Sequence, residues 1–232
     1  MNKTLSIHQP NFIPWFGYFD KIAKSDIFII LDNVQYPRSK SVANRNKIKS
    51  PNGVLELVVP VSKPSGYEGK VSYRMVNFAE KFWYKKILKT IKHSYSRAEY
   101  FEVYFSRLEK FFSMDSFCDM NVEFINFVGK EFELNAKLIL QSSISEDLGN
   151  SNQMIVSLCK LFDANIYLSG TGAKKYNDER FMSQNGIKLE YQDFTCPAYP
   201  QLWGEFIPNL SVIDLLFNCG PESKKFLSAD SK

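Results

Sequence analysis

Three polar residues near the N-terminus, His8, Gln9 and Asn11, combine groups that could carry out acid–base chemistry and bind a ligand. They follow the apolar run at residues 4–7, which is typical of a buried strand. Histidine has an unperturbed pKa close to neutrality, so His8 is a candidate general base. The alternative is that a histidine at a strand end has no function beyond a hydrogen bond to the backbone. The polar groups around His8 favour a functional role. We predict that His8 is catalytic and that Gln9, Asn11 and Trp15 bind substrate.

A second polar stretch, residues 35–49, mixes basic and amide side chains. Guanidinium and ammonium groups bind phosphate oxygens well, which favours a phosphate-binding role. Lysines along a hairpin edge also protect it from aggregation, so a solvated edge is an equal alternative. The Asn52-Gly53 pair that follows is a strong hairpin signal. The candidate binding residues of this stretch are Arg38, Asn44, Arg45 and Lys47.

A glycine-containing turn follows the apolar run at residues 165–168 and precedes a predicted helix. Glycines allow backbone N–H groups to approach an anion, and a helix N-terminus adds a favourable partial charge. Such glycines are also common in tight turns without a ligand, so the nearby lysines and hydroxyl groups are what favour binding. Its candidate binding residues are Ser169, Gly170, Thr171, Gly172 and Tyr176, and Gln201 is a further candidate on a later aromatic loop.

The elements that must position these residues alternate between strands and short helices. Strands are predicted near residues 4–8, 26–31, 137–141, 165–169 and 187–191. Such alternation is typical of a parallel sheet with right-handed crossovers. The predicted fold is therefore α/β, a three-layer Rossmann-like parallel sheet with a β-hairpin and a helical insert. In open sheets of this kind, ligands bind beyond the carboxyl ends of the strands, where His8 is expected.

The chain is predicted to divide into three parts. Residues 1–76 form the first half of the α/β core with the hairpin, and residues 77–136 form the helical insert. Residues 137–232 form the second half of the core, with a proline-rich loop and a C-terminal helix. The aromatic residues of the insert recur at helical spacing, which favours core packing over a cofactor site.

Composition narrows the functional classes. The 232 residues are 44% hydrophobic and 23% charged, enough for one sizeable core. A formal net charge of +4 suits a phosphorylated ligand but is too small to indicate nucleic-acid binding. No signal peptide or bilayer-length apolar run is evident, so we expect a cytoplasmic protein without membrane insertion. The four cysteines lack the spacing of a metal site, and no metal is predicted.

Several separated segments together resemble the WbqC-like protein family over nearly the whole chain. These segments are IHQPNFIPWFGYFDKI, LDNVQY, NRNKIK, YLSGTGAKKYNDERF and YPQLWGEFIPNLSVIDLLFNCGPES. Members of that family are associated with gene clusters for O-antigen and other bacterial surface polysaccharides, some of which contain amino sugars bearing a glycyl or other acyl group. The resemblance therefore implies a role in making or modifying a nucleotide-linked sugar, as in lipopolysaccharide biosynthesis.

Together these lines predict a transferase that forms an amide on the amine of a nucleotide-linked amino sugar. His8 is the predicted base, Asp32 its orienting partner, and Asn33 a further substrate-binding residue at the end of the second strand. Arg45 and Lys47 would hold the diphosphate. The donor stays open between an amino acid activated by ATP, a thioester and an aminoacyl-tRNA, the one role left for a nucleic acid.

Two alternatives belong to other classes. His8 matches one of the two histidines of the HxGH nucleotide-binding signature, which keeps a nucleotidyl-transfer or adenylating enzyme open. A non-catalytic sugar-nucleotide-binding module is the other. Arg45, Lys47 and His8 would not need to meet in one pocket if the protein were a scaffold, so their arrangement separates these classes.

Overall fold

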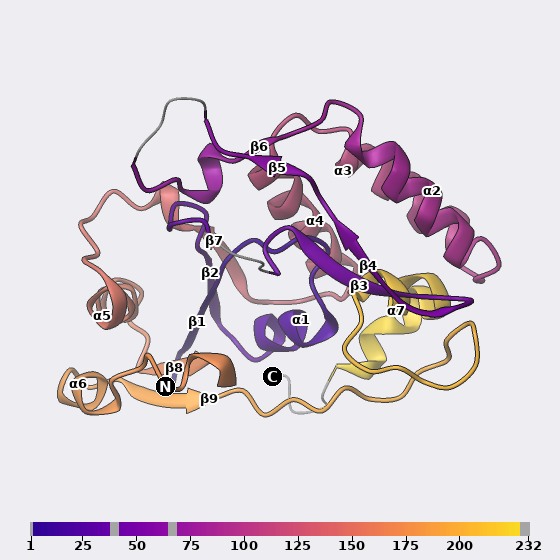
Figure 1. The fold of residues 1–232 in the computed structure, drawn as a ribbon. Helices are drawn as coiled ribbons and strands as arrows, with labels where there is room; N and C mark the ends of the chain where they lie inside the picture. Colours follow the sequence, from indigo (N-terminus) through magenta and orange to yellow (C-terminus); the bar gives the residue numbers. More distant parts are fainter. Residues whose placement is uncertain (1, 38–41, 65–68, 228–232) are drawn as a thin grey trace.

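A parallel sheet forms the centre of the molecule, seen here in a computed structural model that describes residues 2–37, 42–64 and 69–227 (Figure 1). Its strands lie in the order β7-β2-β1-β8-β9, and every neighbouring pair is parallel. This arrangement confirms the predicted α/β class and the five predicted strands. The strands are β1 (Thr4–His8), β2 (Ile27–Ile30), β7 (Lys137–Leu140), β8 (Ile166–Ser169) and β9 (Lys188–Tyr191).

Helices cover both faces of the sheet. Phe28 and Ile30 of β2 pack into one hydrophobic cluster, whereas Ile27 and Ile29 pack into another, because successive side chains of a strand point to opposite faces. Figure 1 shows α1 and α4 on one side of the sheet and α5 and α6 on the other. The covering helices are α1 (Phe16–Ala23), α4 (Phe117–Glu131), α5 (Ser151–Leu161) and α6 (Glu179–Gln184).

The chain between β2 and β7 contains the predicted hairpin. Strands β3 (Arg45–Ser50) and β4 (Gly53–Val58) pair antiparallel. Ser50 lies opposite Gly53, whose φ of 97° is readily adopted only by glycine. A second small antiparallel pair, β5 (Val61–Ser62) and β6 (Asn77–Phe78), follows the hairpin.

Three helices follow the hairpin, as the periodicity predicts. They are α2 (Trp83–Tyr95), α3 (Phe101–Phe112) and α4. Their buried aromatic residues belong to the same hydrophobic cluster as α1 and α7 (Val212–Cys219), which confirms the packing role predicted for them. No helix in the described part of the chain combines the length and apolar character that crossing a membrane requires.

Candidate functional site

The sheet opens at its centre, between β1 and β8. These strands are the first and fourth of the sheet along the chain, and they pair only at Thr4 with Ile166 and at Leu5 with Tyr167. On its other side, β1 pairs with β2 as far as His8. The chain leaves β1 toward β2 and leaves β8 toward β9, so the connections run in opposite directions here. This position is the topological switch point of the sheet, where open α/β sheets place their ligands.

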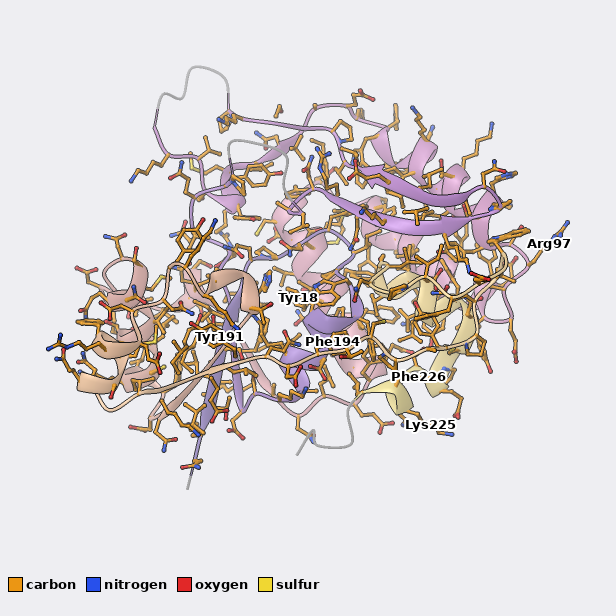
Figure 2. The ribbon with its side chains drawn as sticks, turned by 60° about the horizontal axis from the view of Figure 1, so that its bottom comes forward. Tyr18, Arg97, Tyr191, Phe194, Lys225 and Phe226 are labelled. Carbon is orange, nitrogen blue, oxygen red and sulfur yellow. The ribbon has the colours of Figure 1, made fainter. Side chains whose placement is uncertain are left out.

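Three cavities meet at His8, and we name them here by position. The basic cavity, of about 450 Å³, lies toward the hairpin, and the switch-point cavity, of about 620 Å³, lies over the opening between β1 and β8. The α1 cavity, of about 280 Å³, shares lining residues with both of the other cavities. Trp15, Lys21 and Asp193 are among the residues that line it. In Figure 2, Tyr18 and Phe194 of this cavity project near the middle of the molecule, whereas Arg97 points outward at its edge.

His8 has a defined tautomer in this site. Its Nδ1 lies 3.1 Å from the backbone oxygen of Gln9, which can only accept, so Nδ1 carries the hydrogen and Nε2 is free to accept. The ring packs against Tyr18 at 4.7 Å between centroids. Burial, with the positive charge of Lys21 as a second cause, lowers the pKa of His8 to about 3. The imidazole of the free protein is therefore neutral near pH 7, and this argues against a strong base unless a ligand changes its surroundings.

The loop between β1 and α1 is held in a strained conformation. Ile13 has a φ of 35°, which is unfavourable for a β-branched residue. Its backbone oxygen accepts hydrogen bonds from Asn46 Nδ2 at 2.6 Å and from Ser211 Oγ at 2.7 Å. Asn121 Nδ2 also donates to the oxygen of Pro10 at 3.1 Å. The loop that carries the predicted site residues is thus fixed by three distant parts of the chain.

Trp15 is positioned by the absence of a side chain at Gly17. A Cβ atom at Gly17 would lie 2.3 Å from the indole ring, so only glycine allows this close packing. The indole also makes an edge contact with Phe194 at 5.4 Å between centroids. Trp15 consequently lines both the basic cavity and the α1 cavity.

The basic cavity brings together residues that the sequence places far apart. His8, Asn11, Arg45 and Lys47 all line it, as the sequence hypothesis requires for a ligand site. Asn11 is only 5% exposed, and its carboxamide makes no hydrogen bond within the described residues. Arg45 donates from Nη1 to Glu56 at 3.1 Å, while its buried Nε has no partner in the same part of the structure. These groups remain able to bind a ligand.

The glycine turn lies at the switch-point cavity. Ser169, Gly170, Gly172 and Tyr176 line it together with Gln9, and Thr171 lines the α1 cavity. The turn is fixed from both ends, since Asn177 Nδ2 donates to Ser169 Oγ at 2.9 Å and Asn152 Nδ2 to the oxygen of Tyr176 at 3.0 Å.

Asp32 has partners other than His8. It is completely buried, and its carboxylate accepts from Ser142 N at 2.9 Å, from Ser142 Oγ at 2.5 Å and from Arg74 Nη1 at 3.1 Å. The orienting role predicted for Asp32 has no hydrogen bond to support it among the described contacts. Its observed bonds instead fix the chain after β2 against the chain after β7.

Other predicted residues also lie away from the three cavities. Asn33 is exposed, and Asn44 uses its amide to hold Val59 O at 2.8 Å. Gln201 accepts from Lys49 Nζ at 3.2 Å inside the loop that follows β9. The amide of Asn44 therefore links the two ends of the hairpin, and that of Gln201 links β3 to the loop after β9. Arg38 lies outside the described residues.

Lys21 is a site residue that the sequence reasoning missed. It lines both the switch-point and α1 cavities, is 3% exposed, and donates from Nζ to the oxygen of Ile7 at 3.0 Å. Burial lowers its pKa to about 7. The available signal was a lysine in a short helix that is otherwise mostly apolar, because such a helix is buried on most of its surface.

Comparison with known proteins identifies the family. The model of the WbqC-like protein family matches residues 9–226. The chain is also 31% identical over 229 residues to the uncharacterized protein Rv1507c of Mycobacterium tuberculosis, covering 97% of each chain. No solved structure matches. The chain therefore belongs to the WbqC-like protein family.

Proposed function

We propose that this protein is a transferase that forms an amide, glycyl or other acyl, on the amine of a nucleotide-linked amino sugar in bacterial surface-polysaccharide biosynthesis. The observation that carries the proposal is the meeting of His8, Arg45 and Lys47 in one cavity beside the switch point. A scaffold would not require this convergence, so it favours a ligand site over a mere presenting surface.

The basic cavity is the proposed site of the sugar nucleotide. Arg45 and Lys47 supply positive charge for the diphosphate, and Asn11 supplies a carboxamide for a sugar or base. Trp15 lines the same cavity and offers an aromatic surface. The neighbouring switch-point cavity then remains for the donor, with His8 between the two.

The chemistry forms one bond and breaks another. The sugar amine attacks the carbonyl carbon of an activated acyl donor, the donor's leaving group departs, and the amine loses a proton. His8 Nε2 is the proposed acceptor of that proton. A diphosphate bound nearby favours the charged imidazolium and raises the pKa of His8 from its low value in the free protein, toward the range in which a base is effective.

Incubation with a uridine- or deoxythymidine-diphosphate amino sugar and candidate donors tests the proposal. The donors are an amino acid with ATP, an acyl thioester and an aminoacyl-tRNA. Mass spectrometry should find a sugar nucleotide carrying the added glycyl or acyl mass. Release of pyrophosphate from ATP with an acid, without any amide product, would establish the adenylating alternative instead. Binding of a sugar nucleotide without a product from any pairing would favour the non-catalytic binding module.

Binding measurements test the basic cavity separately. Arg45→Ala and Lys47→Ala should each weaken sugar-nucleotide binding by roughly 1.5–3 kcal/mol, as is typical of hydrogen bonds to charged groups. Lys89 is an exposed lysine of α2 that lines none of the three cavities, so Lys89→Ala is the matched control. Unchanged affinity in both variants would support the alternative interpretation, in which this stretch is a solvated hairpin edge that binds no ligand.

A further inference from the structure

The switch-point cavity contains a buried lysine, Lys21. Lys21 is 3% exposed, and no carboxylate within the described residues forms an ion pair with it. Its ammonium carries three N–H donors, and the oxygen of Ile7 is the hydrogen-bond acceptor that the structure shows for them. The ammonium also lies 5.8 Å from the centroid of the Phe28 ring. A buried charge is normally paired or lost through a shift in pKa, so a negatively charged ligand beside Lys21 would favour its charged form.

The hydrogen bond from Lys21 to the backbone oxygen of Ile7 explains only part of why a lysine is buried here. The β1–β8 pairing ends at Leu5, so Ile7 lies where β8 no longer runs alongside as a partner. Lys21 donates to this carbonyl from α1. A neutral donor would satisfy a carbonyl equally well, so the backbone contact alone does not account for a charged side chain in this position.

The rest of the cavity complements a single negative charge. Its described lining contains no Asp or Glu, and Lys21 is its one Lys or Arg. The basic cavity, in contrast, has two cationic residues, Arg45 and Lys47, and Arg45 is paired there with Glu56. One buried ammonium matches a monoanion better than a diphosphate, whose greater charge would remain largely uncompensated here.

Polar and apolar groups divide the same cavity. Ser151 and Asn152, the first residues of α5, line it, and no described side chain caps that helix N-terminus. Leu31, Met154 and Ile155 add an apolar wall. The cavity can thus hold an anionic group and a small organic body beside it.

We propose that the switch-point cavity binds a carboxylic acid, with the carboxylate paired to the Lys21 ammonium. This inference rests on the proposed function only in assigning that acid as the source of the acyl group, by the ATP-dependent donor route. There ATP converts the carboxylate into an acyl adenylate with release of pyrophosphate, and the sugar amine then displaces AMP and loses a proton. Lys21 and His8 both line this cavity, and His8 also lines the basic cavity, so the acid binds next to the proposed sugar-nucleotide site.

Proton uptake should accompany binding. The free protein has Lys21 about half protonated at pH 7, because burial lowers its pKa to about 7, whereas a bound carboxylate favours the charged form. Among its neighbours, Asp20 on the same helix pairs with Lys24 at 3.0 Å. The titratable groups that share a cavity with Lys21 are His8, Tyr18, Tyr167, Tyr176 and Asp193.

Calorimetric titration of the native protein with acetate, glycine, hexanoate, inorganic phosphate and ATP tests the inference. At least one carboxylate should bind, with roughly eightfold lower affinity at pH 8.5 than at pH 7.5, as linkage to a group of pKa about 7 requires. Buffers of different ionisation enthalpy should reveal uptake of about 0.8 proton at pH 7.5. Lys21→Met should weaken binding by roughly tenfold or more and remove the pH dependence.

Lys89→Met is the matched control and should bind like the native protein. Lys21→Gln provides a second neutral variant, and the pH dependence of the unmodified protein needs no variant at all. Binding of phosphate or ATP through Lys21 without carboxylate binding would overturn the inference, as would carboxylate binding that Lys21→Met leaves unchanged. If acids bind through Lys21 but no amide forms in the transferase assay, only the proposed function fails.

Discussion

Replacing Lys21 by methionine should change how the stability of the protein depends on pH. The lysine has an unfolded pKa of 10.5 and a folded pKa of about 7, lowered by burial. Between these values the unfolded chain binds more protons than the native protein, so the native protein gains stability as pH rises. Methionine has a similar apolar stem and no titratable group, so the variant lacks this gain.

The size of the effect follows from the burial of Lys21. One pKa unit corresponds to about 1.4 kcal/mol, so the fall from 10.5 to about 7 corresponds to about 5 kcal/mol over the full range. Of this change in the free energy of unfolding, roughly 3 kcal/mol is expected between pH 7.0 and pH 9.5. The lost hydrogen bond to Ile7 costs about 1 kcal/mol and is independent of pH.

Urea unfolding of both proteins at several pH values measures this effect. The free energy of unfolding of Lys21→Met, minus that of the native protein, should be roughly 3 kcal/mol greater at pH 7.0 than at pH 9.5. Taking the difference cancels the cysteines and tyrosines that titrate in both proteins. Lys89→Met should give a difference that does not vary with pH. A flat difference for Lys21→Met as well would refute the argument, because Lys21 would then titrate as in the unfolded chain.

Two further predictions concern the loop and His8. Gly17→Ala should displace the Trp15 indole, since a Cβ would lie 2.3 Å from it, and should weaken sugar-nucleotide binding with a visible change in tryptophan fluorescence; unchanged fluorescence would show that the ring adapts in place. His8→Ala should abolish turnover in a folded protein. Burial lowers the folded pKa of His8 to about 3, so the native protein should lose stability as pH falls from 6.5 toward 3. The His8→Ala variant should lose less stability over that range. Equal losses for the two proteins, measured by acid unfolding, would contradict this prediction.

Local sequence patterns determined most of the fold. Apolar runs of strand length between short helices indicated the parallel sheet, because a strand covered on both faces must be apolar throughout, as Ile27–Ile30 is. The Asn52-Gly53 pair indicated the hairpin because glycine readily adopts the positive φ that its turn requires. Helical spacing indicated α2, α3 and α4. Each of these signals depends on residues close together in the chain.

The site was determined only in part by such signals. The end of β1 could be identified from the sequence as a ligand position, since the carboxyl ends of parallel strands lie at one edge of the sheet. The meeting of Arg45 with His8 depends on how the hairpin packs against the loop, and that loop is held by Asn46 and Ser211 from other parts of the chain. No local pattern encodes these contacts.

Tertiary structure alone decided the surroundings of the buried charged residues. Lys21 and Asp32 are both charged residues beside apolar runs, and the sequence does not distinguish their surroundings. The fold pairs Asp32 with Arg74 and Ser142, but it buries Lys21 at the opening of the sheet with no ion pair to an acid in the described part of the chain. The pKa of a group depends on its desolvation and on neighbouring charges, and both are set by elements that are distant in sequence and close only in the folded protein.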